Sequence, residues 1–205
     1  MTFEHPGTYA PPRGWHSRGY LPHFDAGEVP QAITFRLAGS IPAALLREWR
    51  EELKLARIAP RMVADEERRR IEEFLNRGIG PAWLADPRIA NLIEHAFLFF
   101  DGERYRLHAW VVMPNHVHVV ITPLANFSLT GIVSSWKSFT AKQANVMLGR
   151  GGVFWQEDYF DRFIRDERHF AAAIHYAEEN PVVAGLCSSA EDWEFSSARR
   201  RRETG

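Results

Sequence analysis

The sequence predicts an α+β fold, and three observations support that prediction. Runs of β-branched or alternating apolar residues occur at four places, and segments with apolar residues at helical spacing lie between them. Their order along the chain is β-α-β-β-α-β-α. With 205 residues, 45% of them hydrophobic, the chain is long enough for one packed domain. This order fits a ferredoxin-like antiparallel sheet with helices on one face, plus an added C-terminal helix.

The first half of the predicted domain holds one strand and three helical segments. "QAITFRLAG" alternates through Ile33, Phe35 and Leu37, which is typical of a half-buried strand. Apolar residues at helical spacing predict a helix from Pro42 to Lys54 and a second helix around residues 66–76. "PRIANLIEHAFLFF" predicts a third helix, and the "DG" that follows it is a turn signal.

The second half holds three strands and two helices. "RYRLHAWVVMP" and "HVHVVITPL" predict an adjacent antiparallel pair, interrupted at Pro114-Asn115. "SLTGIVSSWKSFTAKQANVML" predicts a helix capped by Ser128, and "VFWQEDYFDRFI" a fourth strand. "DERHFAAAIHYAEENP" predicts the closing helix, with Asp166 as its cap and Pro181 as its stop.

The expected organisation is one domain with decorations at both ends. We expect an extended N-terminal arm over residues 1–30, a domain over 31–190 with a helical insertion around 42–98, and a basic tail over 191–205. The single cysteine, Cys187, cannot form an internal disulfide. The N-terminus lacks a signal-peptide pattern, and no apolar run approaches the ~20 residues of a membrane span. We therefore expect a reduced, cytoplasmic protein.

The charge of the chain gives little help with function. The formal net charge is −1, whereas nucleic-acid-binding domains usually carry a basic excess. Two basic clusters exist, "ERRRIEE" near residue 70 and "ARRRRETG" at the C-terminus. We interpret the first as a solvated helix face, because glutamates are interleaved with its arginines. We interpret the second as a flexible tail, and whether it contacts phosphates stays open.

A histidine pair interrupts the most apolar strand, "VVMPNHVHVV". Side chains at i and i+2 of a strand share a face about 7 Å apart, so the imidazoles of His116 and His118 can converge on one divalent ion. The alternative is that one histidine packs against aromatic neighbours and the other meets solvent. Two ligands do not make a site, so a third donor has to come from elsewhere.

The closing helix offers two polar candidates. Tyr176 and Asn180 lie four residues, or one turn, apart and at the edge of that helix's apolar stripe. Docked on a sheet, the helix would aim both at a groove. The alternative is that Tyr176 is a boundary aromatic and Asn180 a helix C-cap before proline.

An ordered set of motifs resembles the REP-associated tyrosine transposases, relatives of the HUH group of single-tyrosine transposases. The motifs are "YLPHFD", "ITFRLAG", "WLADPRIA", "LHAWVVMPNHVHVVITP", "SSWKSFTA", "FWQEDYFDRFIRDE", "YAEENPVVAGL" and "DWEFSSA". Singly they are weak, but together they cover most of the chain after residue 19.

The resemblance implies a catalytic HUH domain with a defined set of active-site residues. It makes His116 and His118 the metal-binding pair, Tyr176 the nucleophile and Asn180 a third, polar ligand. It also implies a ferredoxin-like fold and single-stranded DNA with imperfect palindromic hairpins as substrate. The reaction implied is a transesterification that leaves a 5′-phosphotyrosine and a free 3′-hydroxyl. Such nitrogen and oxygen ligands suit Mg²⁺ or Mn²⁺, and of the two ions Mn²⁺ accepts imidazole ligands more readily.

The DNA contacts expected from the sequence are cations and aromatic residues around this site. The favoured phosphate contacts are Lys137, Lys142, Arg162, Arg165 and Arg168. The aromatic side chains that either stack on bases or pack on the strand face are Trp155, Tyr159 and Phe160. Tyr159 is also a rival nucleophile, but no ligand partner lies one turn away. In "YLPHFD", His23 and Asp25 either bind nucleotides or belong to an arm that covers a sheet edge.

Two other classes of function stay open, and so does the oligomeric state. A domesticated DNA-binding regulator would keep the fold without the chemistry, and a metal-dependent hydrolytic nuclease would use water as nucleophile. A homodimer with the tyrosine supplied in trans and a monomer are both compatible with the sequence. We expect the protein to act at the nucleoid.

Overall fold

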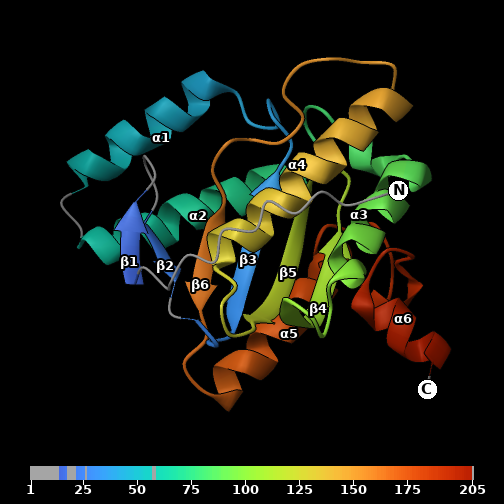
Figure 1. Ribbon diagram of the computed structural model, residues 1–205. Helices are drawn as coiled ribbons and strands as arrows, with labels where there is room; N and C mark the ends of the chain where they lie inside the picture. The colour runs from blue at the N-terminus through green and yellow to red at the C-terminus, as the bar shows by residue number, and fades with distance from the viewer. Residues whose placement is uncertain (1–13, 18–21, 26, 57–58, 205) are drawn as a thin grey trace.

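The computed structural model describes residues 14–17, 22–25, 27–56 and 59–204 (Figure 1). The strands are β1 (Gly14–Ser17), β2 (Pro22–Asp25), β3 (Gln31–Arg36), β4 (Tyr105–Val112), β5 (His116–Pro123) and β6 (Phe160–Phe163). The helices are α1 (Ala43–Leu55), α2 (Pro60–Asn76), α3 (Pro87–Phe99), α4 (Leu129–Met147), α5 (Glu167–Val183) and α6 (Ser197–Thr204), with short 3₁₀ turns η1 (Trp83–Ala85) and η2 (Ala190–Asp192).

Four strands form the central sheet in the order β4-β5-β3-β6, and every neighbouring pair is antiparallel. This order is the ferredoxin-like arrangement expected from the sequence, and the adjacent pairing of β4 with β5 is confirmed. In the pairing of β3 with β5, Thr34 lies opposite His118 and Arg36 opposite His116. Opposed residues share a face, so both histidines have polar cross-strand neighbours.

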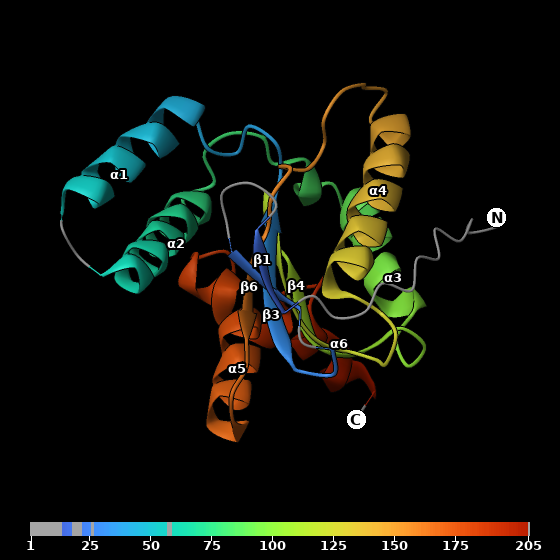
Figure 2. The ribbon, with the colours of Figure 1, turned by 60° about the vertical axis from the view of Figure 1, so that its left-hand side comes forward.

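Helices α3 and α4 cover one face of the sheet, and α5 lies on the other (Figure 2). The larger core lies under α3 and α4, where Ile33 and Phe35 of β3 meet Phe97 and Trp136. Fully burying one such side chain contributes about 1.5–3 kcal/mol. The smaller core lies under α5 and includes Ala177. The predicted class, a sheet with helices on one face plus an added C-terminal helix, is confirmed.

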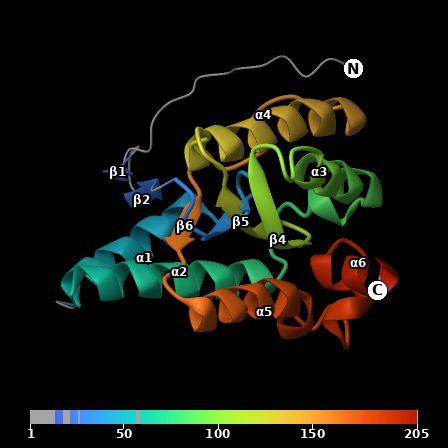
Figure 3. The ribbon, with the colours of Figure 1, turned by 60° about the horizontal axis from the view of Figure 1, so that its bottom comes forward.

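The insertion before β4 is a helical hairpin of α1 and α2 that joins the face of α5 (Figure 3). Its own small core contains Ile41, Ile71 and Leu75. Helix α2 begins at Pro60, earlier than the apolar spacing indicated, because proline is well tolerated in the first turn of a helix. The hairpin therefore brings α2 close to the helix that carries Tyr176.

Two boundary predictions were wrong. The fourth strand is short, since β6 begins only at Phe160 and Trp155 makes an isolated bridge with Leu37. Pro181 does not stop α5, which continues to Val183. Near the end of a helix, proline removes only one intrahelical bond. The C-cap is Ala184, and the next residue is Gly185, whose φ of 69° suits a glycine after a C-cap.

Both ends of the chain are more structured than the sequence indicated. β1 and β2 pair as a two-stranded sheet where an extended arm was expected. The basic tail contains α6, which is fixed to the domain rather than loose. The buried carboxylate of Glu178 accepts hydrogen bonds from Ser197 and from Arg201. Ser197 also receives the backbone N–H of Trp110 at 3.0 Å. Of the helices described, none has the length and apolar character to cross a membrane.

Candidate active site

The two histidines of β5 lie on the sheet face that α5 covers, and their side chains converge. The Nε2 atoms of His116 and His118 are 3.0 Å apart, and the rings meet edge to face with centroids 4.8 Å apart. Only 1% and 3% of the two residues are exposed. Of the two alternatives left open by the sequence, the convergent arrangement is the one observed.

The other ring nitrogens are held by neighbouring side chains. His116 Nδ1 lies 2.6 Å from Asn115 Oδ1, and His118 Nδ1 lies 2.9 Å from Thr34 Oγ1. Asn115 is itself fixed, because its Nδ2 donates to the carbonyl of Leu75 at the end of α2. A partner on Nδ1 orients an imidazole and leaves Nε2 free to bind a metal, as in many metal sites.

Both imidazoles are held neutral, which is the form that binds a metal. Burial, together with the nearby positive charge of Arg68, lowers the pKa of His118 to about 3. Burial also lowers the pKa of His116 well below its usual value, with an added contribution from His118. The pair is therefore deprotonated throughout the physiological range.

Tyr176 extends from α5 toward His118, and Asn180 lies one turn further along the same helix. The rings of Tyr176 and His118 are 5.5 Å apart and edge to face. Asn180 is 3% exposed, and its Nδ2 donates to the carbonyl of Tyr176 at 3.3 Å. Its Oδ1 is buried and has no hydrogen-bond partner in the part of the chain that the structure describes. An unsatisfied buried carbonyl costs about 1–3 kcal/mol, so an unfilled acceptor here needs an explanation.

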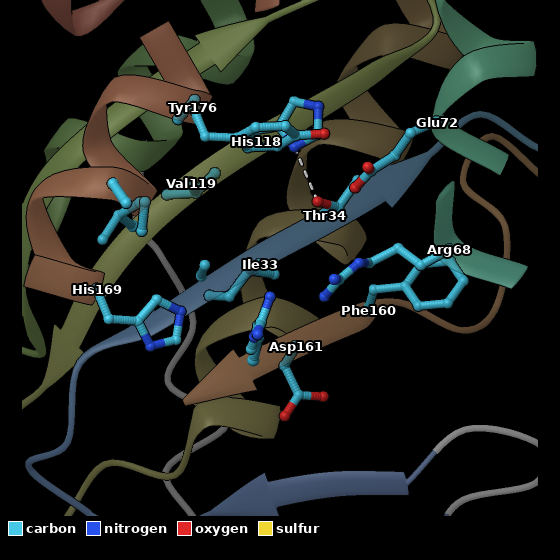
Figure 4. Close-up of a pocket in the computed structure, with 16 residues that line it drawn as sticks. Ile33, Thr34, Arg68, Glu72, His118, Val119, Phe160, Asp161, His169 and Tyr176 are labelled. Atoms are coloured by element: carbon cyan, nitrogen blue, oxygen red, sulfur yellow. Dashed lines mark hydrogen bonds between the residues drawn. The ribbon is translucent and has the colours of Figure 1, made fainter. Parts of the chain in front are cut away.

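A cavity of about 280 Å³ runs from the histidines along α5 (Figure 4). Thr34, His118 and Tyr176 line it on one side, and Arg68 and Glu72 of α2 line it on the other. Tyr176 is 45% exposed, yet partial burial raises the pKa of its phenol. The negative charge of Glu72, which lines the same cavity, raises that pKa further. Burial also raises the pKa of Glu72.

Arg68 and Glu72 are site residues that the sequence reasoning missed. The sequence suggested that the "ERRRIEE" cluster is a solvated helix face. That interpretation holds for some of its charged residues but not for Arg68 and Glu72. Arg69 and Arg70 do form surface ion pairs with glutamates. Arg68 and Glu72 are four residues apart and flank the apolar positions that pack the helix onto the domain. That spacing was the available signal.

The cations expected to contact DNA fall into two groups. Arg162, Arg165 and Arg168 lie together on β6 and the start of α5, all exposed, and Arg162 also lines the active-site cavity. Lys137 lies elsewhere, on α4, and its ammonium donates to the carbonyl oxygens of Gln156, at 2.7 Å, and of Glu157. Lys142 is exposed on α4.

The aromatic candidates pack into the protein. Trp155 is 4% exposed, stands edge-on to Phe35 and donates from Nε1 to Thr140 at 2.9 Å. Tyr159 is 6% exposed, with its hydroxyl 3.3 Å from that of Thr130. Phe160 is half-buried and packs against the α1–α2 core. The packing alternative thus describes all three, and Tyr159 is too enclosed to compete as a nucleophile.

His23 lies on β2, where its backbone pairs with His16. The side chains of His23 and Asp25, and so their expected role with nucleotides, lie outside the described residues.

The donors at the histidine pair fit a divalent cation. Within the described ranges, no three side chains among His, Cys, Asp and Glu form a metal-binding group. The amide oxygen of Asn180 is a donor of another type and lacks a partner among the described residues. Two neutral imidazoles and one amide oxygen leave positions open, as Mn²⁺ or Mg²⁺ prefers when it also binds phosphate and water.

Comparisons with known proteins show which proteins this chain resembles in sequence and in fold. Residues 86–180 match the family model described as "Transposase IS200 like". The REP-associated tyrosine transposase of Escherichia coli (strain K12) is 28% identical over 111 residues, which span 53% of this chain and 64% of that relative. The match therefore covers less than two thirds of the relative's own length.

A solved structure of a REP-associated tyrosine transposase bound to a REP hairpin also matches. Its TM-score is 0.56 at 18% identity, over 90% of this chain and 86% of the other, which shows a shared fold. The family match contains His116, His118, Tyr176 and Asn180. It begins after the end of α2, which it therefore does not include. The resemblance of this chain to the REP-associated tyrosine transposases, expected from its motifs, is thus confirmed by family, sequence and fold.

Proposed function

We propose that the protein is a metal-dependent endonuclease and strand-transfer enzyme that acts on hairpin-bearing single-stranded DNA. One observation carries the proposal: within a single chain, the Tyr176 ring lies 5.5 Å from an imidazole of a converging histidine pair. Because the two elements belong to one chain, the geometry favours a tyrosine acting in cis, and a homodimer is not needed to complete the site. An enzyme of this kind would act at the nucleoid.

The residues proposed to hold the metal are His116, His118 and Asn180. When bound, a divalent cation there would neutralise charge on the phosphate oxygens and orient the scissile phosphate. Asn115 and Thr34 would keep the two imidazoles in the ligating orientation through their contacts with Nδ1.

The Tyr176 hydroxyl is the proposed nucleophile, and Glu72 is its proposed proton acceptor. A phenol is almost fully protonated at neutral pH, and burial makes this one less acidic still, so a base has to take its proton. Glu72 lines the same cavity as Tyr176, interacts electrostatically with its phenol and has a raised pKa, all of which suit a general base. Arg68 lowers the pKa of Tyr176 and so favours the phenolate.

The reaction would exchange one phosphodiester for another. The Tyr176 oxygen bonds to phosphorus, the bond from phosphorus to the 3′-oxygen breaks, and the released 3′-oxygen takes up a proton from solvent. The product is a 5′-phosphotyrosine and a free 3′-hydroxyl, so strands can be rejoined without an external energy source. Arg162 lines the same cavity and would meet the approaching phosphate.

Hairpin DNA is the proposed substrate class. The solved relative with the same fold was captured with a REP hairpin, and the exposed arginines of β6 and α5 provide phosphate contacts beside the cavity. These arginines give the site a local positive charge despite the neutral average of the chain.

A labelled hairpin oligonucleotide incubated with the protein and Mn²⁺ tests the proposal. A denaturation-resistant protein–DNA adduct is expected, and Tyr176→Phe should abolish it. Tyr159→Phe is the matched control, because it removes the same hydroxyl from the enclosed tyrosine and should leave the adduct intact. Cleavage without an adduct would indicate a hydrolytic nuclease instead, and binding without cleavage a regulator.

A further inference from the structure

A second cavity lies at the β6 edge of the sheet, between the α1–α2 hairpin and α4. Its volume is about 840 Å³, within the range of about 300–1,000 Å³ typical of small-molecule sites. It shares only Phe160 with the lining of the active-site cavity. Four cationic side chains line it, namely Arg36, Arg47, Arg50 and Lys137.

Arg36 is the unusual member of this group. It is only 7% exposed, and its Nη1 donates to Ser40 Oγ at 3.1 Å. No carboxylate pairs with it within residues 27–56 and 59–204. A guanidinium has five N–H donors and is almost never buried without a counter-ion, because desolvating an unpaired charge costs several kcal/mol.

The nearest charge makes the position of Arg36 still less favourable. Burial, together with repulsion from Arg50, lowers the pKa of Arg36 to about 10. Arg50 is itself paired with Glu67 at 2.8 Å, so that carboxylate is already engaged. Two guanidiniums that repel each other across a cavity are stabilised by an anion between them.

The lining of the cavity also includes two carboxylates, Glu157 and Asp158. Burial lowers the pKa of Lys137 to about 8, and the charges of Asp158 and Glu157 oppose that shift. Neither carboxylate contributes to the pKa shift of Arg36, so Lys137 is the cation whose charge they offset. An incoming anion would bind on the arginine side.

We propose that this cavity is a phosphate-binding site in which Arg36 is the anchoring donor. The planar fork of arginine matches two oxygens of a phosphate, and Arg47, exposed on α1, adds a second cation at the cavity. The phosphate belongs either to a nucleic-acid strand or to a free phosphorylated small molecule. Arg36 lies opposite His116 in the sheet, so a strand held here would run beside the histidine pair. Only this last step rests on the proposed function.

Thermal melting and calorimetry on the full chain test the site with two probes, inorganic phosphate alone and a short oligothymidine. Wild-type protein should be stabilised by phosphate, and Arg36→Met should lose that stabilisation. In buffer without phosphate, Arg36→Met should melt at or above the wild-type temperature, because replacing an uncompensated buried charge with an apolar side chain is often neutral or stabilising. Arg36→Lys should respond only partly, since an ammonium lacks the fork.

The control variant is Arg106→Met, which removes an exposed arginine from β4 at the opposite edge of the sheet. If a nucleic-acid strand is the source of the phosphate, Arg36→Met should also weaken oligothymidine binding roughly tenfold. A response to phosphate alone would identify a free phosphorylated molecule. Equal responses to both probes in Arg36→Met and wild type, or equal losses in Arg106→Met, would overturn the site.

These outcomes are separate from those of the proposed catalysis. Tyr176→Phe should keep the Arg36-dependent response to phosphate. If wild-type protein formed no adduct but kept that response, the proposed chemistry would fail and the phosphate site would stand. An adduct without any Arg36-dependent phosphate response would support the chemistry and exclude the phosphate site.

Discussion

The two faces of the central sheet are made from the same strands but differ in chemistry. On β5, Val117, Val119 and Ile121 point into the apolar core under α3 and α4, whereas His116 and His118 point to the side of α5. The first face is closed by two long helices and filled with aromatic rings. The second is covered by α5 and α2, which leave a cavity lined by charged groups.

This difference shows how one strand supports stability and chemistry at once. Alternation along a strand sends every second side chain to the opposite face, so a functional residue can be added without disturbing the packed layer. On the polar face, each buried polar side chain then needs a hydrogen-bond or charge partner. Each histidine is held by a neighbour, while Asn180 Oδ1 and Arg36 remain without adequate partners in the described part of the chain. On the polar face, buried polar or charged groups without a protein partner mark the places where we expect ligands to bind.

The largest expected effect would break the apolar face. Phe97 is fully buried and packs edge-on against Trp136 with ring centroids 5.0 Å apart. Phe97→Ala should lower the free energy of unfolding by about 3–5 kcal/mol, because it removes buried surface and leaves a cavity. Denaturant unfolding measures this loss. Adduct formation per folded molecule should stay near the wild-type rate, and a selective loss of activity would contradict the separation of the two faces.

The next effect would break the polar face while sparing the fold. His116→Ala should lower the rate of hairpin cleavage by more than about a hundredfold, since even residues that only support a metal ligand cost 10–100-fold. Hairpin binding, measured by fluorescence anisotropy, should be largely retained. His108→Ala is the matched control, because His108 is on the same sheet face but pairs with Thr122 and contacts Phe170. Equal loss of binding and cleavage in His116→Ala would count against this assignment.

A third test sharpens the role of α2 on the polar face. Glu72→Gln should slow adduct formation about a hundredfold at neutral pH, within the range for loss of a general base. In the wild type, the rate should fall as pH drops through the raised pKa of Glu72, because only the carboxylate accepts a proton. Single-turnover rates across pH should show that limb in the wild type and lack it in the variant. Full activity of Glu72→Gln would exclude Glu72 as the base.

The smallest effect concerns the neutral histidines. The folded-state pKa of His118 is about 3, below its unfolded value of about 6.5, so the unfolded chain binds more protons between these values. Stability should therefore fall as pH decreases, with His118 contributing a loss of about 2 kcal/mol between pH 7 and pH 5. Urea unfolding in the presence of a chelator measures the loss, which should be smaller in His118→Gln. Identical pH dependence in the two proteins would show that His118 is not held neutral.

Local patterns were sufficient to predict most of the strands and helices. The strand alternation, the helical spacing and the caps are short-range properties of the chain. The side chains of Ser128 and Asp166 accept backbone hydrogen bonds at the starts of α4 and α5, as expected of caps. The HxH spacing fixed a shared face for the histidines, and one helical turn did the same for Tyr176 and Asn180.

Residues whose environment depends on distant elements were not predictable. Trp155 has the composition of a stacking platform, but the helix that covers it makes it a core residue. In the sequence, Glu72 and Arg68 look like surface charges. They line the active-site cavity only because α2 lies beside α5 in the folded chain. The position of Arg36 follows the alternation of side chains along β3. Nothing nearby in the sequence, however, indicates that residues of α1 and α4 enclose it.

The sequence by itself determined the order of strands and helices, the faces on which the histidines, Tyr176 and Asn180 lie, and the family that the chain resembles. These follow from backbone geometry, which repeats every two residues in a strand and every 3.6 in a helix. Only the tertiary structure decided that α2 brings a carboxylate to the cavity of the tyrosine and that Arg36 is buried with no counter-ion among the described residues. Burial and charge pairing depend on which distant segments pack together, and no local period encodes that choice.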